Sequence, residues 1–402
     1  MLRSLFSGIS GLKAHQQMMD VVSNNIANVN TIGYKTASVV FEDTLSQLMR
    51  ASSAPTTTTG GVDPTQIGLG VQLGAVQTNF LQGSTEITNK SSDLMIQGDG
   101  FFVLKDGNTQ VYSRAGAFTL DTDGYLVNSN GMYAVGYAAT NGVVNSFGAL
   151  SKIQLAAGTS APGSATSAVT LAGNLSPTGS TALTVTATVY NVNGAASALP
   201  VTFTPHSPPD GGYDINVDDP QNPGTSLATG NIAFDAAGAF DPTTSTNPIN
   251  VTVNGSTMDI DISTMTGYSG TSSPTPKKVN GYMAGTLTQY QVGDDGVVTG
   301  IFSNGQNLAM GQIATATFNN PSGLEKLGDS VYRTSSNSGL AEIGVPGSGG
   351  RGALIAGALE MSNVDLALEF TNLIIAQRGF SANSKVITAS DEMLQDLVNI
   401  KR

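Results

Sequence analysis

The stretch SNVDLALEFTNLIIAQRGFSANSKVITASDEMLQDLVNIKR, residues 362–402, decides how this chain is organised. An apolar column with seven-residue spacing runs along it and begins just upstream, with Leu359, Leu366, Leu373, Phe380, Ile387 and Leu394. Such a sustained repeat is typical of helices that supercoil against other helices. Residues 359–402 are therefore predicted to form a long helical region. Its helix is expected to start at Ser362, where Ser362 and Asp365 resemble a capping box.

A second column with the same spacing lies at the other end of the chain, within residues 1–33. Its members are Leu5, Leu12, Met19 and Ile26. The pattern predicts a helix from about Ser4 to Asn28, closed by an Asn-rich turn that ends at Gly33. Helices at both ends cannot form a domain core by themselves, so they must pair with each other or with neighbouring copies. We therefore predict that both columns lie in a subunit interface.

The composition favours close packing of subunits over binding of nucleic acid. Only 11% of the 402 residues are charged, against about 25% in ordinary soluble domains. Few charges then have to leave water when surfaces meet. The formal net charge is −12, and no basic patch stands out to bind phosphates.

Several patterns that could indicate chemistry do not have the context that the chemistry needs. Cysteine is absent, and the two histidines, His15 and His206, lie far from any nucleophile motif. Gly347–Gly352 fits G-x-G-x-x-G, but a helix follows it rather than a parallel strand. Asp121 and Asp123 indicate a turn, because the further ligands of a calcium loop are missing. We expect no enzyme activity, no cofactor and no metal.

Neither a signal peptide nor a membrane-spanning segment is expected. The first 25 residues contain no continuous apolar run of signal-peptide length and no small-residue cleavage site. The sequence also has no stretch of about 20 apolar residues. The chain is therefore expected either to stay in the cytoplasm or to be exported without cleavage, and not to insert into a membrane.

The segments between the terminal helices are predicted to be mainly β. Asp-Gly and Asn-Gly turns between apolar alternations indicate hairpins over 69–146 and 281–358, with turns expected at Gly98–Gly100 and Asp121–Gly124. Residues 147–280 are rich in Ser, Thr, Ala and Gly and indicate a separate all-β domain inserted between those halves. Residues 34–68 are expected to form a segment that connects the first helical region to the β region. This segment is expected to contain a short helix on Phe41, Leu45 and Leu48, followed by a loop.

Four ordered stretches resemble the bacterial flagellar rod and hook proteins. They are NNIANVNTIGYK at 24–35, LMIQGDGFFVL at 94–104, YSRAGAFTLDTDGYLVNSNGMYAVGY at 112–137, and residues 362–402. The inserted β domain resembles the outer domain of hook members, whereas residues 41–61 resemble a stretch that rod members carry. The residues carried over from the family motifs are Asn24, Asn25, Ala27, Asn28, Gly33, Lys35, Gln377 and Arg378.

The resemblance implies a fold class and an assembly. It implies a mainly β chain with long terminal α-helices in a coiled-coil-like layer, an inner discontinuous β domain and an inserted outer all-β domain. It implies a tubular homopolymer that acts as a curved universal joint on the outside of the cell. The implied partners are the flagellar rod, hook cap and hook–filament junction proteins and the flagellar type III export apparatus. A distal rod subunit is the alternative within the family, and a secreted surface binding module is the alternative outside it.

Overall fold

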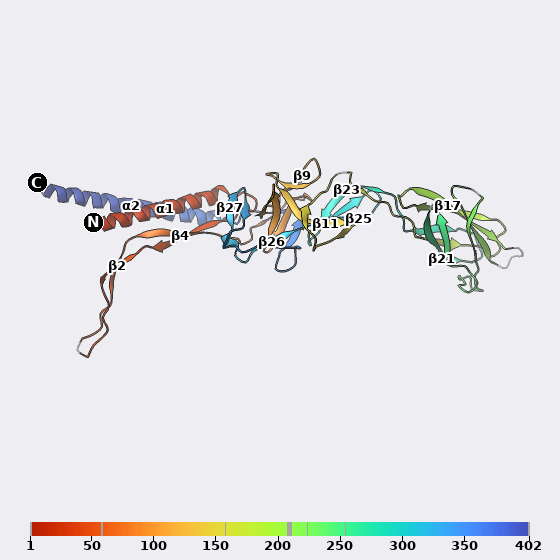
Figure 1. Cartoon of the computed structure of the whole chain (residues 1–402), viewed down its shortest axis with the longest axis horizontal. Coiled ribbons are helices and arrows are strands. Elements are labelled where there is room, and N and C mark those ends of the chain that lie inside the picture. The colour runs from red at the N-terminus through yellow and green to blue at the C-terminus, as the bar shows by residue number, and fades with distance from the viewer. Residues whose placement is uncertain are drawn as a thin grey trace. The chain divides into compact units, whose positions relative to one another are not determined.

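The computed structural model describes residues 2–57, 59–156, 158–206, 211–222, 224–253 and 255–400 (Figure 1). Residues 1, 401 and 402 of the predicted helical regions lie outside these ranges. The chain divides into two compact units. The first comprises Met1–Ala156, Gln291–Thr299 and Ala309–Arg402, and the second comprises Ala157–Tyr290 and Gly300–Leu308. Each unit is described on its own below.

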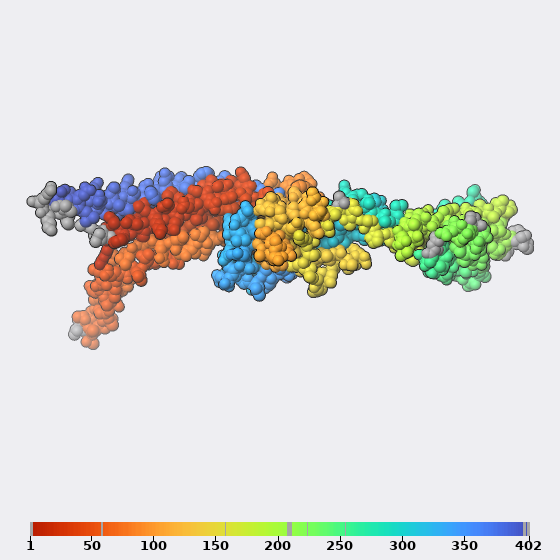
Figure 2. All heavy atoms as spheres, turned by 45° about the horizontal axis from the view of Figure 1, so that its top comes forward, coloured from red at the N-terminus to blue at the C-terminus, as the bar shows by residue number. Residues whose placement is uncertain are grey.

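Within the described residues, the long helices lie at the two ends of the chain, as the apolar columns predict. They are α1 (Leu2–Ala27) and α2 (Leu366–Ile400), which lie side by side in Figures 1 and 2. Helix α2 begins four residues later than predicted, because Asp365 caps it. The Asp365 Oδ1 atom accepts hydrogen bonds from the backbone N–H groups of Ala367 and Leu368. No helix among the described residues is long and apolar enough to span a membrane.

The predicted short helix on Phe41, Leu45 and Leu48 is wrong. This part of the first unit forms antiparallel ribbons, in which β1 pairs with β4 and β2 pairs with β3. Residues of β1 alternate between half-buried and exposed, which is the two-residue period of a strand. The β-branched Val39 and Val40 favour that conformation. The β2–β3 ribbon is exposed at every residue and points away from the helices in Figure 1.

The strands of the first unit come from both ends of the chain. In chain order they are β1 (Ala37–Asp43), β2 (Ser46–Arg50), β3 (Thr65–Gly68), β4 (Val71–Thr78), β5 (Thr85–Ile87), β6 (Leu94–Gln97), β7 (Phe101–Asp106), β8 (Thr109–Ser113), β9 (Phe118–Leu120), β10 (Leu126–Asn128), β11 (Tyr133–Thr140), β12 (Val143–Val144), β13 (Leu150–Lys152), β26 (Thr315–Thr317), β27 (Glu325–Gly328), β28 (Val331–Arg333), β29 (Glu342–Gly344), β30 (Ala353–Ala356) and β31 (Ala358–Glu360). A 3₁₀ helix, η1 (Pro321–Gly323), lies between β26 and β27. Three further strands, β23 (Gly285–Val292), β24 (Val297–Phe302) and β25 (Asn307–Ile313), fall partly in each unit.

The main sheet of the first unit has the order β25-β11-β7-β8-β28-β27. Its core contains Phe101, Val103, Tyr112, Val135, Tyr137, Ala314, Ala316, Phe318 and Tyr332. The turn at Asp121–Gly124 joins the paired strands β9 and β10, as predicted. The turn predicted at Gly98–Gly100 is not a hairpin turn, because β6 pairs with β30 and not with β7. Strand β7 instead forms its hairpin with β8.

The second unit consists mainly of two four-stranded sheets, with orders β20-β21-β15-β22 and β16-β17-β18-β19. Its strands are β14 (Ser160–Ala161), β15 (Ala168–Asn174), β16 (Leu183–Tyr190), β17 (Ala196–Pro205), β18 (Tyr213–Asp218), β19 (Ser226–Ile232), β20 (Ile249–Val253), β21 (Ser256–Thr266) and β22 (Thr275–Val279). Buried and exposed residues alternate along β16, β18 and β20, and the buried side chains form one apolar core. Strand β14 pairs with β23, and Ala161 lies directly opposite Gly285.

Candidate assembly site

Small residues let α1 and α2 approach closely. A Cβ atom added at Gly11 would lie 2.7 Å from the Asn383 side chain, and one added at Gly8 would lie 3.3 Å from Ile387. On the other helix, a Cβ atom added at Gly379 would lie 2.5 Å from the His15 ring. Each helix therefore receives a side chain of its partner in a notch that only glycine leaves open. This glycine seam fixes the register of the pair.

The predicted apolar columns lie beside this seam. On α1, Leu5, Leu12, Met19 and Ile26 are all half-buried. On α2, the half-buried members are Leu373, Ile387 and Leu394, whereas Leu366 and Phe380 are 39% and 37% exposed. Leu359 is not helical. It is buried in β31, opposite Glu86 of β5, because α2 starts only after the Asp365 cap. In the single chain the columns keep apolar surface that α1 and α2 do not cover.

A further apolar stripe runs along one flank of α2, at the border of the surface that meets α1, where Val386 lies near Gly8. It comprises Leu368, Ile375, Val386 and Met393, which are between 43% and 57% exposed. Their spacings of seven, eleven and seven residues keep them on one side of a helix with 3.6 residues per turn. Phe370 and Ile374 on α2, and Phe6 and Ile9 on α1, are also exposed. Large apolar groups exposed in this density mark a surface that another molecule covers.

A buried ionic cluster joins the helical end of the first unit to its strands. Lys35 Nζ donates to Glu360 Oε1 at 2.6 Å and to the Leu81 carbonyl at 2.7 Å. Arg114 Nη1 lies 3.3 Å from Glu360 Oε2, and the Gly83 N–H donates to Glu360 Oε1. The Lys35 and Glu360 side chains are fully buried. Burial lowers the pKa of Lys35, and the hydrogen bond to Glu360 opposes that change.

Asn25 makes a second connection, between α1, β1 and α2. Its side-chain amide donates to the Ala37 carbonyl and to Glu369 Oε1, while its Oδ1 accepts from the Ala37 N–H and the Tyr34 hydroxyl. Glu369 is only 7% exposed. Burial raises the pKa of Glu369, the hydrogen bond from Asn25 acts in the opposite direction, and the Asp365 carboxylate adds to the rise. Asparagine is a poor helix former, and this network explains why one occupies α1 here.

The turn after α1 also depends on close backbone contacts. Gly33 has a φ of +66°, and an added Cβ atom would lie 2.6 Å from the Ala115 backbone nitrogen. The Gly33 N–H donates to the Glu360 carbonyl at 2.8 Å. A residue with a side chain could adopt neither this conformation nor this approach without moving the strand. Gly33 thus places Lys35 within reach of Glu360.

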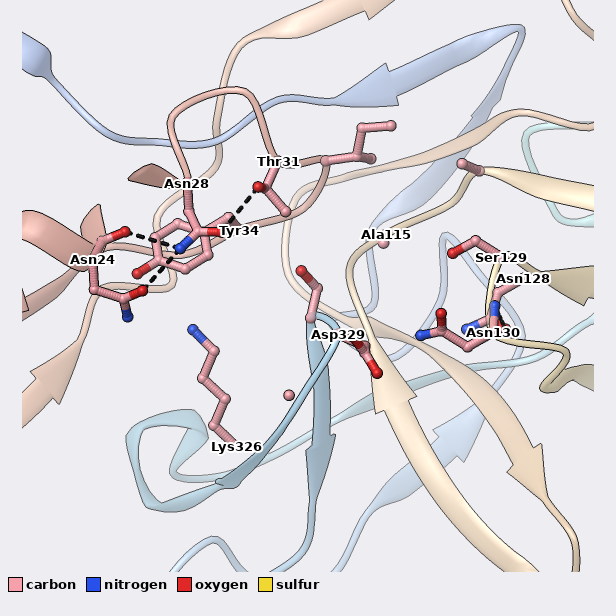
Figure 3. Close-up of a pocket in the computed structure, with 14 residues that line it drawn as sticks. Asn24, Asn28, Thr31, Tyr34, Ala115, Asn128, Ser129, Asn130, Lys326 and Asp329 are labelled. Carbon is pink, nitrogen blue, oxygen red and sulfur yellow. Dashed lines mark hydrogen bonds between the residues drawn. The ribbon is translucent and has the colours of Figure 1, made fainter. Parts of the chain in front are cut away.

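A groove of about 580 Å³ lies beside this turn (Figure 3). Its lining is rich in amides and hydroxyls, including Asn24, Asn28, Asn128 and Asn130. The Asn28 amide donates to the carbonyl and side chain of Asn24, which closes the end of α1. On the opposite wall, the Lys326 ammonium group lies 4.2 Å from the centre of the Tyr34 ring. Among the described residues, no group of three or more His, Asp or Glu side chains could hold a metal ion.

Three segments of the chain match flagellar family models. Residues 5–35 match the flagella basal body rod protein model, and residues 95–166 match the D1 domain of the flagellar hook protein FlgE/F/G. Residues 355–400 match the C-terminal model of the flagellar basal body rod FlgEFG proteins. These segments contain α2, nearly all of α1 and the turn that carries Lys35.

Full-length relatives decide the family. The chain is 37% identical over 453 residues to the flagellar hook protein FlgE of Borreliella burgdorferi, and 35% identical over 463 residues to that of Treponema pallidum. It is 32% identical over 403 residues to the flagellar basal-body rod protein FlgG of Bacillus subtilis. Each of these alignments covers 100% of both chains. The chain belongs to the flagellar rod and hook protein family.

The structure places the residues of the flagellar family motif in different surroundings. Asn25, Gly33 and Lys35 come together at the junction of helices and strands, and Asn24 and Asn28 close α1 beside the groove. Ala27, Gln377 and Arg378 are exposed and do not join either group.

Sequence reasoning about this flagellar family chain missed several residues. Local patterns did not identify Glu360, Arg114 and Glu369, because each pairs with a residue hundreds of positions away in the chain. The exposed stripe on α2 could have been found from its mixed spacing of seven and eleven residues.

Proposed function

We propose that this chain is a structural subunit of the flagellar hook. Copies assemble into a curved tube that acts as a universal joint and transmits torque from the rod to the filament. The observation that carries the proposal is the exposed apolar surface along α1 and α2, in a chain that aligns over its full length with proteins named flagellar hook protein. A solitary subunit would leave this surface in water.

The terminal helices would form the subunit interface. Leu5, Leu12, Met19, Ile26, Leu366, Leu373, Phe380, Ile387 and Leu394 would meet neighbouring copies together with the exposed stripe on α2. The β strands of the first unit would form a middle layer, and the second unit would form the outside of the tube. The low charge of the chain would help outer units to slide as the tube bends, since few strong ion pairs would break at each step.

The proposed location is the hook, outside the cell. The chain would travel through the flagellar type III export apparatus without losing a signal peptide. Its partners would be the rod, the hook cap and the hook–filament junction proteins. It would act without a cofactor, and not as an enzyme, because its function is mechanical.

A distal rod subunit is the second candidate, and one observation favours it. The chain is 32% identical over its full length to a basal-body rod protein, although the two hook proteins are more similar. Electron microscopy of basal bodies from a strain that lacks the gene separates the candidates. Complete rods without hooks are expected. Truncated rods would instead place the chain in the rod, and normal flagella would point to a surface binding module.

The interface is tested by Ile375→Asp. Ile375 is 53% exposed, so we expect the variant subunit to fold normally but to form no tubes, because a charge would enter the contact between copies. Ser381→Asp on the same helix is the control, because Ser381 is exposed, lies outside the stripe and the change also adds one negative charge. Tubes that form equally well with Ile375→Asp would contradict the proposed role of the stripe.

A further inference from the structure

Phe147 is an aromatic side chain that the single subunit does not use. It lies in the turn between β12 and β13 and is 98% exposed. The turn is closed by a hydrogen bond from the Gly148 N–H to the Asn145 carbonyl, and the Phe147 N–H donates to Asn145 Oδ1. Turns of this kind favour small polar residues, and nothing in the fold requires a phenyl ring here. These bonds hold the backbone of Phe147 and leave its ring in water.

An aromatic pocket of about 370 Å³ lies elsewhere on the same unit. The rings of Phe80, Phe101 and Phe318 line it and contact one another edge to face, with centroids 5.5 and 5.6 Å apart. The Arg114 guanidinium lies 5.4 Å from the centre of the Phe101 ring, and its Nε has no hydrogen-bond partner among the described residues. Gly349 and Gly350 form part of the rim and add no side chains there. The glycine-rich loop that resembles a nucleotide motif thus leaves this pocket open.

We propose that Phe147 of one copy inserts into this aromatic pocket of a second copy. The inference rests on the proposed function, since it names a contact within the polymer. A phenyl ring in the pocket would meet the half-buried Phe80 at the edge of this cluster, in which Phe101 and Phe318 are already buried, and edge-to-face contact is an arrangement that aromatic side chains prefer. Residues 138–151 carry no charge, and the charged residues that line the pocket, Asp99 and Arg114, have opposite signs. The Phe147 turn therefore brings no further charge to the pocket, where Arg114 is already paired with Glu360.

The size of the contact makes it one anchor within a larger interface. A phenylalanine side chain buries about 200 Å², whereas a stable interface buries about 800 Å² on each partner. The exposed stripe of α2 can supply further area. Because the ring and the pocket are different parts of the surface, the contact is head-to-tail. Such contacts build open helical filaments rather than closed dimers.

The absence of cysteine from the chain allows a direct test. Ser146→Cys lies next to the ring and keeps it, and Asn319→Cys lies at the rim of the pocket. Full-length chain that carries both substitutions is assembled into tubes and treated with a short bismaleimide. We expect covalent trimers and longer oligomers. The pair Ser146→Cys and Asn108→Cys is the control, because Asn108 is exposed but not part of the pocket, and it should give no ladder.

Other cross-linking results would overturn the proposal. Dimers without longer species would mean a reciprocal contact, and normal tubes without cross-links would mean that the ring lies elsewhere. Either result would leave the proposed hook function intact. Two other results together would contradict the proposed function itself. They are wild-type chain that forms no tubes, and normal hooks on a strain that lacks the gene.

Phe147→Ala measures the strength of the contact. We expect the subunit concentration needed for assembly to rise roughly 10- to 100-fold, which corresponds to losing one buried phenylalanine. The melting temperature of the unassembled subunit should stay unchanged, because the ring is exposed there. Val192→Ala, at a residue that is 71% exposed in the second unit, is the control. Assembly of Phe147→Ala at the wild-type concentration would contradict the proposal.

Discussion

At the scale of single residues, Glu360 organises the junction between the helices and the strands. Its carboxylate accepts hydrogen bonds from the Lys35 and Arg114 side chains and from the Gly83 N–H. Its backbone carbonyl accepts one from the Gly33 N–H. A buried ion pair of this kind adds little net stability compared with apolar residues, but removing one partner leaves a charge without compensation. The cluster therefore acts mainly by fixing one geometry.

Lys35→Met tests this cluster. Because Glu360 would lose its closest cation, we expect the free energy of unfolding of the first unit to fall by about 3 kcal/mol. Denaturant unfolding of the full chain measures the change. Lys90→Met is the matched control: Lys90 is largely exposed and lies 3.8 Å from Asp93, so its loss should cost at most about 1 kcal/mol. Equal losses in the two variants would mean that the buried cluster has no special role.

The raised pKa of Glu369 leads us to predict that the stability of the fold depends on pH. Burial raises its pKa above the ordinary value of 4.5, so the folded chain holds this proton more tightly than the unfolded chain. The free energy of unfolding should therefore fall as the pH rises through the window just above 4.5. Glu369→Gln should remove this slope and be more stable than the wild type at pH 7. Urea unfolding at pH 5 and pH 7 checks this, with Glu392→Gln at an exposed position of α2 as the control. A variant that keeps the wild-type slope would contradict it.

At the scale of elements, the glycine seam decides how α1 and α2 pair. The apolar columns correctly predict two long helices, but the closest approach runs through Gly8, Gly11 and Gly379. A heptad pattern identifies surfaces that are buried somewhere, either within the chain or between copies. It does not show which of them meets the partner helix in the same subunit.

Gly11→Leu tests the seam. The new side chain would collide with Asn383, and overpacking of this kind typically costs about 1 to 3 kcal/mol. We expect the β strands of both units to keep their fold and the helix pair to melt at a lower temperature. We also expect the variant not to assemble into tubes. Circular dichroism and electron microscopy measure these effects. Gln16→Leu, which adds the same side chain at an exposed position of α1, should behave like the wild type. Normal tubes from Gly11→Leu would refute the seam.

At the scale of the whole molecule, strand register shows where the second unit can be removed. Ala161 and Gly285 lie opposite each other in the β14–β23 pair, so a two-residue Asn-Gly turn can replace residues 162–284. We expect tubes to form with altered curvature, because the excised residues contain both four-stranded sheets and none of the helices. Electron microscopy of the tubes measures this. Failure to form tubes would show that the excised residues carry essential contacts.

Local pattern was enough to predict the two helices, many of the strands and the turn at Asp121–Gly124, because helix and turn preferences act between residues close in the chain. It failed for residues 41–48 and for the turn at Gly98–Gly100, where the choice of partner strand overrides local preference.

The sequence by itself determined that the chain has long apolar helices at its ends and turn-rich β segments between them. Only the tertiary structure decided that Lys35 meets Glu360, 325 residues away, and that Asn25 meets Glu369, 344 residues away. Burial favours such polar pairs only after distant strands and helices have come together and excluded water.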